Sequence, residues 1–140
     1  MFKPKSASGD DHLKKWTSQI RKGSLEMCLL SVLAHQARYG FEIVQLLNGA
    51  GGLGITEGTL YPLLNRLQNE GLIEAFWQES ASGPPRKYYR LTPDGEDLLG
   101  QMRSEWRRFG VAVETLLAES ERPGSPEAIA TPLEMRPRPS

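Results

Sequence analysis

The sequence predicts a mainly α-helical fold with one small β-hairpin, arranged as a winged helix-turn-helix between an N-terminal helix and a long C-terminal helix. Apolar residues spaced three and four apart indicate successive short helices, and two β-rich segments around a turn indicate the hairpin. A regular apolar seam near the C-terminus indicates a coiled-coil-like helix. A chain of 140 residues has room for one such domain with unstructured ends.

Both ends of the chain lack the apolar residues that a core requires. Residues 1–10 are polar, and residues 120–140 contain five prolines among Ser, Glu and Arg. We therefore expect both ends to be disordered. The winged helix-turn-helix is assigned to residues 11–92 and the long terminal helix to residues 93–119.

Two short helices are predicted before residue 34. Leu13, Trp16 and Ile20 have the spacing of one face of an amphipathic helix. Gly23 is expected to end this helix, and Ser24 is expected to cap the next one. The second helix has an apolar face formed by Leu25, Leu29, Val32 and Leu33.

Two further helices are predicted, the first from about Tyr39 to Asn48, where glycines follow. The second is predicted from about Thr56 to Asn69, because four leucines form a one-sided stripe. These leucines are Leu60, Leu63, Leu64 and Leu67. Since Pro62 removes a helical hydrogen bond, a start nearer Thr59, with the proline in the first turn, is the alternative.

A β-hairpin is predicted after these helices. Residues 72–79 are rich in Ile, Phe and Trp, residues 87–92 contain two tyrosines, and residues 80–85 between them are turn formers. Side chains alternate across a strand, so either Tyr88 or Tyr89 is buried together with Leu91. We expect Tyr89 to be the buried one.

The last helix has the most regular pattern. Thr92 supplies a capping hydroxyl, Pro93 suits the first helical position, and Asp94 places an acid in the first turn. The seam that follows consists of Leu99, Met102, Trp106, Phe109, Val113 and Leu116. A lone helix would expose this seam to water, so we expect a second copy of the chain to cover it in a homodimer.

The helix from about Thr56 to Asn69 is the best candidate for a helix that reads DNA. Its outward positions are Glu57, Thr59, Tyr61, Asn65, Arg66 and Gln68. Asn, Gln and Arg pair with base edges in the major groove, whereas Thr and Tyr reach phosphates. Arg86 and Lys87 at the base of the hairpin suit the neighbouring backbone or minor groove. The formal net charge of zero does not oppose this, because phosphate contacts depend on where the cations lie.

Five segments in order carry a resemblance to a known family. They read RKGSLE at 21–26, YGFEI at 39–43, EGTLYPLL at 57–64, RLQNEGLI at 66–73 and PRKYYRLTPDG at 85–95. The chain resembles the PadR family of bacterial transcriptional regulators, in the short subgroup with a single C-terminal dimerisation helix. The resemblance implies a homodimer that binds an inverted-repeat operator in double-stranded DNA, usually as a repressor.

The candidate DNA-binding residues combine this resemblance with the polar positions described above. Those on and beside the reading helix are Tyr39, Thr56, Thr59, Leu60, Tyr61, Asn65 and Arg66. Those on the return strand of the wing are Arg86, Lys87 and Tyr88.

The resemblance also implies a small aromatic effector, phenolic or drug-like. Trp106 matches a tryptophan that stacks on planar compounds in some family members, and Met102, Phe109 and Trp16 could line the same space. The alternative is that these seam residues are plain core. Gly110, one turn further along, offers no carboxylate to a cationic ligand.

Other classes of function are disfavoured. The sequence has no G-x-S-x-G, H-E-x-x-H or phosphate-loop motif, so we expect no enzyme and no cofactor. His12, His35 and Cys28 do not have metal-ligand spacing, and Cys28 is expected to be a buried, inert thiol. No apolar run is long enough to cross a membrane, and the cytoplasm is the expected location. A winged-helix adaptor that binds protein without specific DNA binding is the alternative function.

Overall fold

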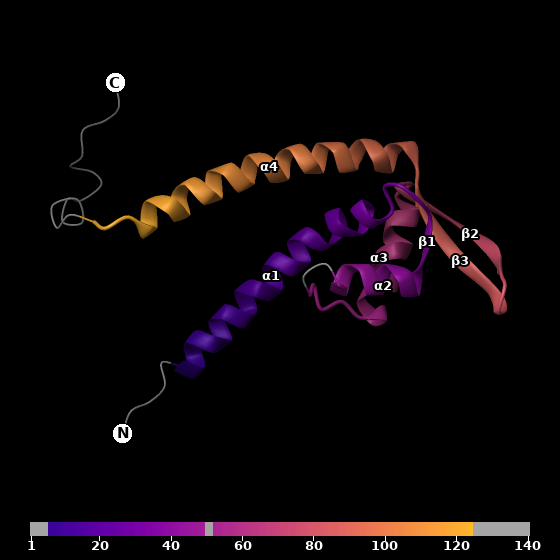
Figure 1. The fold of residues 1–140 in the computed structure, drawn as a ribbon, viewed down its shortest axis with the longest axis horizontal. Helices are drawn as coiled ribbons and strands as arrows, with labels where there is room; N and C mark the ends of the chain where they lie inside the picture. Colours follow the sequence, from indigo (N-terminus) through magenta and orange to yellow (C-terminus); the bar gives the residue numbers. More distant parts are fainter. Residues whose placement is uncertain (1–5, 50–51, 125–140) are drawn as a thin grey trace. The chain divides into compact units, whose positions relative to one another are not determined.

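The computed structural model describes residues 6–49 and 52–124 (Figure 1). The elements follow one another as α1 (Ser6–Val32), β1 (Arg38–Tyr39), α2 (Gly40–Gly49), α3 (Glu57–Asn69), β2 (Ile73–Ser80), β3 (Gly83–Leu91) and α4 (Pro93–Glu121). The chain divides into a winged-helix unit, up to Arg103, and a second unit from Ser104 onwards. Within the described residues, none of the helices has the length and apolarity needed to cross a membrane.

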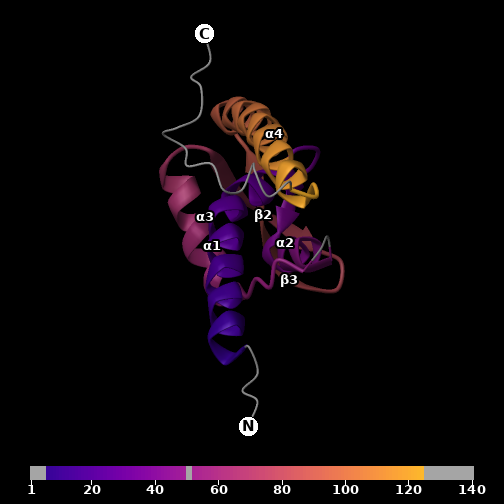
Figure 2. The same ribbon diagram turned by 90° about the vertical axis from the view of Figure 1, so that its left-hand side faces the viewer.

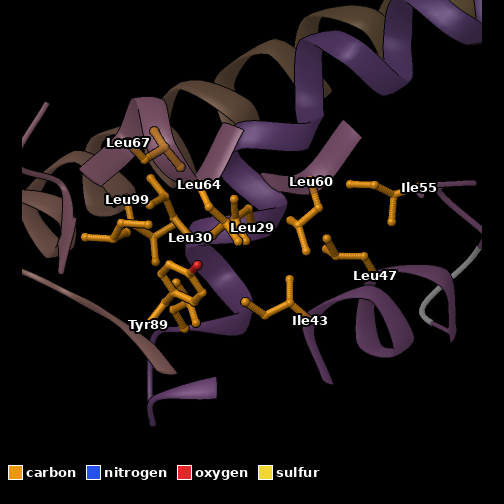
Figure 3. Packing of buried hydrophobic residues seen from close by; sticks show 12 residues of the cluster. Leu29, Leu30, Ile43, Leu47, Ile55, Leu60, Leu64, Leu67, Tyr89 and Leu99 are labelled. Atoms are coloured by element: carbon orange, nitrogen blue, oxygen red, sulfur yellow. The ribbon is translucent and has the colours of Figure 1, made fainter. Parts of the chain in front are cut away.

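The core of the winged-helix unit is built by the helices and the sheet together. Figure 3 shows leucines and isoleucines of several elements meeting the ring of Tyr89. The core residues are Leu29, Leu30, Leu33, Ile43, Leu47, Ile55, Leu60, Leu64, Leu67, Ile73, Tyr89 and Leu99. The predicted fold class is therefore confirmed: α2 and α3 pack on the sheet, and α1 packs on α2 (Figures 1 and 2).

The N-terminal part is one helix, whereas the sequence predicted two. α1 continues through Gly23, and the hydroxyl of Ser24 donates to the carbonyl of Ile20, 2.8 Å away, so that it caps nothing. Glycine inside a helix costs about 1 kcal/mol, which lowers stability without ending the helix. α1 also includes residues 6–10, which were expected to be disordered; residues 1–5 and 125–140 lie outside the described residues.

The start of α3 agrees with the first of the two predicted positions. Thr56 is the N-cap, with extended backbone, and its side-chain oxygen accepts a hydrogen bond from the Thr59 amide at 3.3 Å. Pro62 lies inside the helix, so the alternative start near Thr59 is wrong. The cap and the three buried leucines of the stripe outweigh the one hydrogen bond that proline removes.

The sheet contains a strand that the sequence did not predict. Its order is β1-β3-β2, and all pairs are antiparallel. β3 begins at Gly83, four residues before the predicted start, and includes Pro84 and Pro85. β1 pairs with β3 only at Tyr88 and Tyr89, and the register between β2 and β3 is irregular between Gln78 and Ser80, opposite the two prolines. Proline is tolerated at such edges and bulges. Tyr89 is the buried tyrosine, as predicted.

The start of α4 is as predicted, but the beginning of its seam is not. The Thr92 side-chain oxygen accepts a hydrogen bond from the Gly95 amide at 3.1 Å, and Pro93 is the first helical residue. Leu99, predicted to face a second copy, is 1% exposed and belongs to the core of its own chain. Met102 also packs against this core. The assignment of Leu99 to a dimer interface is therefore wrong, because its surface is already covered.

Candidate nucleic-acid interface

The exposed face of α3 presents hydroxyl and amide groups. Thr56, Thr59 and Asn65 are exposed, and Tyr61 is 40% exposed. The hydroxyls of Thr56 and Thr59 lie 3.3 Å apart at the first turn, close enough for one to donate to the other. The turn therefore offers hydrogen-bonding groups of the kind that contact phosphates and bases.

Leu60 does not belong to this face. Its side chain is fully buried among the leucines of the core. The assignment of Leu60 to the DNA-binding set is therefore wrong as far as its side chain is concerned. The leucine stripe already predicted that this residue packs inward, and that pattern outweighs its place in a matching motif.

Arg66 lies apart from the other candidates on α3. Its guanidinium forms ion pairs with Glu70 at 2.9 Å, one turn further along, and with Glu26 of α1 at 3.4 Å. Both carboxylates are partly exposed, and so is the arginine. The structure thus places Arg66 in an ionic contact between α3 and α1.

A row of aromatic and basic side chains runs across one face of the sheet. The rings of Tyr39 and Tyr88 lie edge to face with centroids 5.5 Å apart, and Tyr88 stacks on Phe76 at 5.9 Å. The Arg86 guanidinium lies 4.5 Å from the ring centre of Tyr39, and that of Arg90 lies 4.6 Å from Phe76. We call Tyr39, Phe76, Tyr88, Arg86 and Arg90 the aromatic–basic row.

Tyr61 of α3 contacts the start of α2. A Cβ atom at Gly40, the first residue of α2, would overlap the hydroxyl of Tyr61. The Tyr61 side chain therefore lies against the start of α2, next in sequence to Tyr39. The Tyr39 amide in turn donates to the Glu42 carboxylate at 3.2 Å, which fixes the start of α2. The structure brings Tyr39, Arg86 and Tyr88 together, and it places Tyr61 against Gly40 at the start of α2.

Lys87 lies on the opposite face of the sheet from Arg86. It pairs with Trp77, and its ammonium lies 5.8 Å from the ring of the buried Tyr89. The sequence grouped Arg86 and Lys87 at the base of the wing, but neighbouring strand residues point to opposite faces. The prediction that Tyr89 is buried already implied this separation.

Several surface residues were missed by the sequence reasoning. Phe76 and Arg90 complete the aromatic–basic row, where Arg90 also pairs with Glu74 at 2.7 Å. Trp77 is 68% exposed on the other face. Alternation across the hairpin could have placed Phe76 and Arg90 beside Tyr88. By contrast, a two-residue strand such as β1 has no periodic signal.

Burial affects two titratable groups in this unit. It raises the pKa of the half-buried Cys28 thiol, which keeps the thiol protonated and unreactive at neutral pH. Burial, followed by the charge of Tyr61, raises the pKa of Tyr89. Within residues 6–49 and 52–124, no cluster of His, Cys, Asp and Glu could hold a metal ion.

The residues proposed for effector binding and dimerisation differ in exposure. In the winged-helix unit Trp16 is exposed and Met102 is half-buried. In the second unit the apolar side chains of the seam are exposed: Trp106, Phe109, Val113 and Leu116.

Comparisons with known proteins identify relatives of this chain. Residues 29–101 match the sequence profile of the transcriptional regulator PadR-like family. A transcriptional regulator of Mycobacterium tuberculosis is 31% identical over 85 residues, which cover 61% of this chain and 78% of that protein. An uncharacterized protein of Lysinibacillus sphaericus is 35% identical over 91 residues, covering 64% of this chain and 84% of the relative.

Solved structures extend the similarity to the fold. A PadR-like transcriptional regulator from Bacillus cereus is 39% identical with a TM-score of 0.67, covering 71% of this chain and 96% of that one. A PadR family transcriptional regulator from Eggerthella lenta is 35% identical with a TM-score of 0.71, covering 80% of this chain and 97% of that one.

Proposed function

Since the chain belongs to the PadR-like family of transcriptional regulators, we propose that it is a homodimeric repressor that binds an inverted-repeat operator and is released by a small aromatic effector. In each protomer α3 enters the major groove, and the hairpin β2–β3 follows the adjacent backbone as a wing. Two-fold symmetry of the protein then matches two-fold symmetry of the site. The family consists of regulators and not of enzymes.

The observation that carries the DNA-binding proposal is an exposed polar face on α3 together with an exposed cation, Arg86, on the wing. Tyr61 of α3 lies against Gly40 at the start of α2, next in sequence to Tyr39 of the aromatic–basic row. Arg86 is held over the ring of Tyr39 and carries no ion pair within the described residues. A cation so placed is available to a phosphate, whereas Arg66 and Arg90 already have carboxylate partners.

Dimerisation is supported by the apolar residues that the chain leaves uncovered. Trp106, Phe109, Val113 and Leu116 lie on one stripe of α4 and are exposed. Water-exposed stripes of this spacing pack against a partner helix, and a second copy is the simplest partner. Because Leu99 is buried in its own core, the dimer seam begins after Met102.

The proposed effector site uses the same exposed aromatic residues. Trp106 and Phe109, both in the second unit, offer flat apolar surfaces. Planar aromatic molecules stack on such rings, with a preference for offset geometry. An effector bound between the protomers would change their spacing and so the fit of two α3 helices to one operator.

The test is DNA binding by two neighbouring single variants. Fluorescence anisotropy with a duplex from the upstream region of the protein's own gene, against unrelated DNA as competitor, gives affinity and salt dependence. Arg86→Ala should weaken binding about tenfold and lower the slope against log salt by about one, since one phosphate contact is lost. Lys87→Ala, the matched control on the other face of the strand, should change the affinity less than threefold or so.

Two results would oppose the proposal. Equal losses of DNA affinity in the two variants would show that DNA binding does not depend on the aromatic–basic row. If the protein binds no DNA even at low salt, the adaptor function takes precedence, and the exposed ring of Trp77 becomes the first surface to examine for a protein partner.

A further inference from the structure

A cavity of about 180 Å³ lies beside the first turn of α3, between α1 and the connection from α2 to α3. α1 contributes Ser18, Arg21, Lys22 and Leu25, spaced so that they share one helical face. The other wall comes from residues 53–55 and Thr59. All of these residues belong to the winged-helix unit and none of them to the aromatic–basic row.

The wall opposite α1 is fixed by hydrogen bonds. The Asn48 side chain accepts from the Ile55 amide at 2.8 Å and donates to the Ile55 carbonyl at 3.0 Å. Gly54 has a φ of +66°, which favours glycine, and its Cα faces the Arg21 guanidinium; an added Cβ would lie 3.5 Å from Nη1. Residues 54 and 55 are thus held beside the cavity, with Gly54 next to Arg21.

The chemistry of the cavity is that of an oxyanion site with an apolar floor. Arg21 and Lys22 supply cationic donors, and the hydroxyls of Ser18 and Thr59 supply neutral ones. None of the described residues that line it is acidic. Leu25, Leu53 and Ile55 form the apolar part of the lining.

The two cations of the cavity differ from several arginines of the described residues. Arg38, Arg66 and Arg90 each pair with a carboxylate. In residues 6–49 and 52–124, by contrast, neither Arg21 nor Lys22 is among the ion pairs. Two adjacent cations without carboxylate partners attract an anion, and a phosphate has enough acceptor oxygens for Arg, Lys and two hydroxyls together.

We propose that this cavity binds the phosphate group of a phosphate ester, with the phosphate on Arg21 and Lys22 and the ester carbon on the apolar floor. The phosphate comes either from the DNA backbone beside the major groove or from a small phosphate ester. The DNA source rests on the proposed function, whereas the small-molecule source does not. Because Thr59 belongs to both the cavity and the exposed face of α3, occupancy of the cavity is linked to the reading helix.

The experiment is an NMR titration of the full chain with inorganic phosphate and with phenyl phosphate. The resonances followed are the side-chain Nε–H of Arg21 and the backbone amides of Leu53, Ile55 and Thr59. Arg21→Gln should weaken phosphate binding about tenfold, since a charge-assisted hydrogen bond is lost. Arg103→Gln, a change of equal charge on exposed α4 outside the cavity, should leave it unchanged.

A second variant tests the cavity without changing its charge. Leu53→Phe fills the apolar floor and should weaken phenyl phosphate more than inorganic phosphate. Thermal unfolding of each variant checks that the fold is kept. Saturable shifts that Arg21→Gln removes and Arg103→Gln keeps support the proposal. Absence of such shifts, or equal shifts in Arg21→Gln, would overturn it.

The DNA arm then distinguishes the two sources. If a backbone phosphate occupies the cavity, duplex DNA competes with phenyl phosphate, and Arg21→Gln lowers the salt slope of DNA binding by about one. If the slope is unchanged while phenyl phosphate still binds, the ligand is a small phosphate ester. A protein that binds no specific DNA would contradict the proposed function, yet the phosphate titration would still decide for or against the cavity.

Discussion

One apolar seam on α4 serves two different environments. Leu99, in the winged-helix unit, is 1% exposed and packs in the core of its own chain, whereas Leu116, in the second unit, is 72% exposed. Both residues have the same type of side chain and lie on the same heptad pattern. Periodicity therefore identifies the apolar face of a helix, but not whether its own chain or a partner covers it.

Truncation of the buried end of the seam should have the greatest consequence for folding. Leu99→Ala should lower the free energy of unfolding by about 2–5 kcal/mol, because it leaves a cavity in the core. Chemical denaturation followed by circular dichroism measures this. Leu116→Ala is the matched control, and at concentrations where the protein is monomeric it should cost about 0.5 kcal/mol or less. Similar losses in the two variants would abolish the distinction between the two parts of the seam.

A charge placed on the exposed part of the α4 seam should weaken dimerisation without affecting the folding of the chain. Phe109→Glu places a carboxylate on the proposed dimer seam and should raise the dimer dissociation constant by about a hundredfold, equivalent to roughly 3 kcal/mol. Sedimentation velocity over a concentration series measures the association. The circular dichroism spectrum and the core of the winged-helix unit should be unchanged. A variant that stays dimeric would show that this face is not the interface.

The helix caps provide a smaller test within the winged-helix unit. Thr56→Ala removes the hydroxyl that accepts from the Thr59 amide and should cost about 1 kcal/mol. Thr56→Ser is the control that keeps the acceptor and should be nearly neutral. Unfolding midpoints in urea distinguish the two. An equal cost in both variants would indicate that the methyl group, and not the cap, stabilises the start of α3.

The smallest effect on stability is expected from a change at Tyr89, which belongs to the same core as Leu99. Burial raises its pKa above the ordinary value of about 10, so the folded state holds the phenolic proton more tightly than the unfolded state. The protonated Tyr89 contributes its full share of the stability at a pH below the ordinary pKa. This share is lost as the pH rises through the raised pKa of the folded state. Tyr89→Phe should flatten the decline of the unfolding midpoint above about pH 10. An unchanged decline would assign the alkaline sensitivity to other groups.

The parts of the fold that could be predicted are those with strong local signals. The cap at Thr92 and the leucine stripe of α3 depend on neighbouring residues, and the structure confirms both. Gly23 was misjudged because its low helix propensity is a small cost that the packing of α1 overrides. β1 was missed because its two residues form a strand only by pairing with β3, which is distant in sequence.

The site was partly predictable for the same reason. Strand alternation predicted the burial of Tyr89. The same alternation, extended back along β3, places Lys87 on the face of Tyr89 and Arg86 on the opposite face. The ion pair of Arg66 with Glu26 joins residues of α3 and α1 that lie 40 positions apart, and no local pattern predicts it. For Leu60 the leucine stripe, which predicts burial, is a better guide than the motif that contains it.

The most direct test of DNA recognition by this chain is selection of binding sites from a pool of random duplexes. A homodimer that reads DNA with two α3 helices should enrich an inverted repeat with half-sites about 10 base pairs apart from centre to centre, or a multiple of this. Phe109→Glu should enrich single half-sites or nothing. Enrichment of an unpaired motif by the unaltered protein, or of no motif at all, would contradict a dimeric operator-binding regulator.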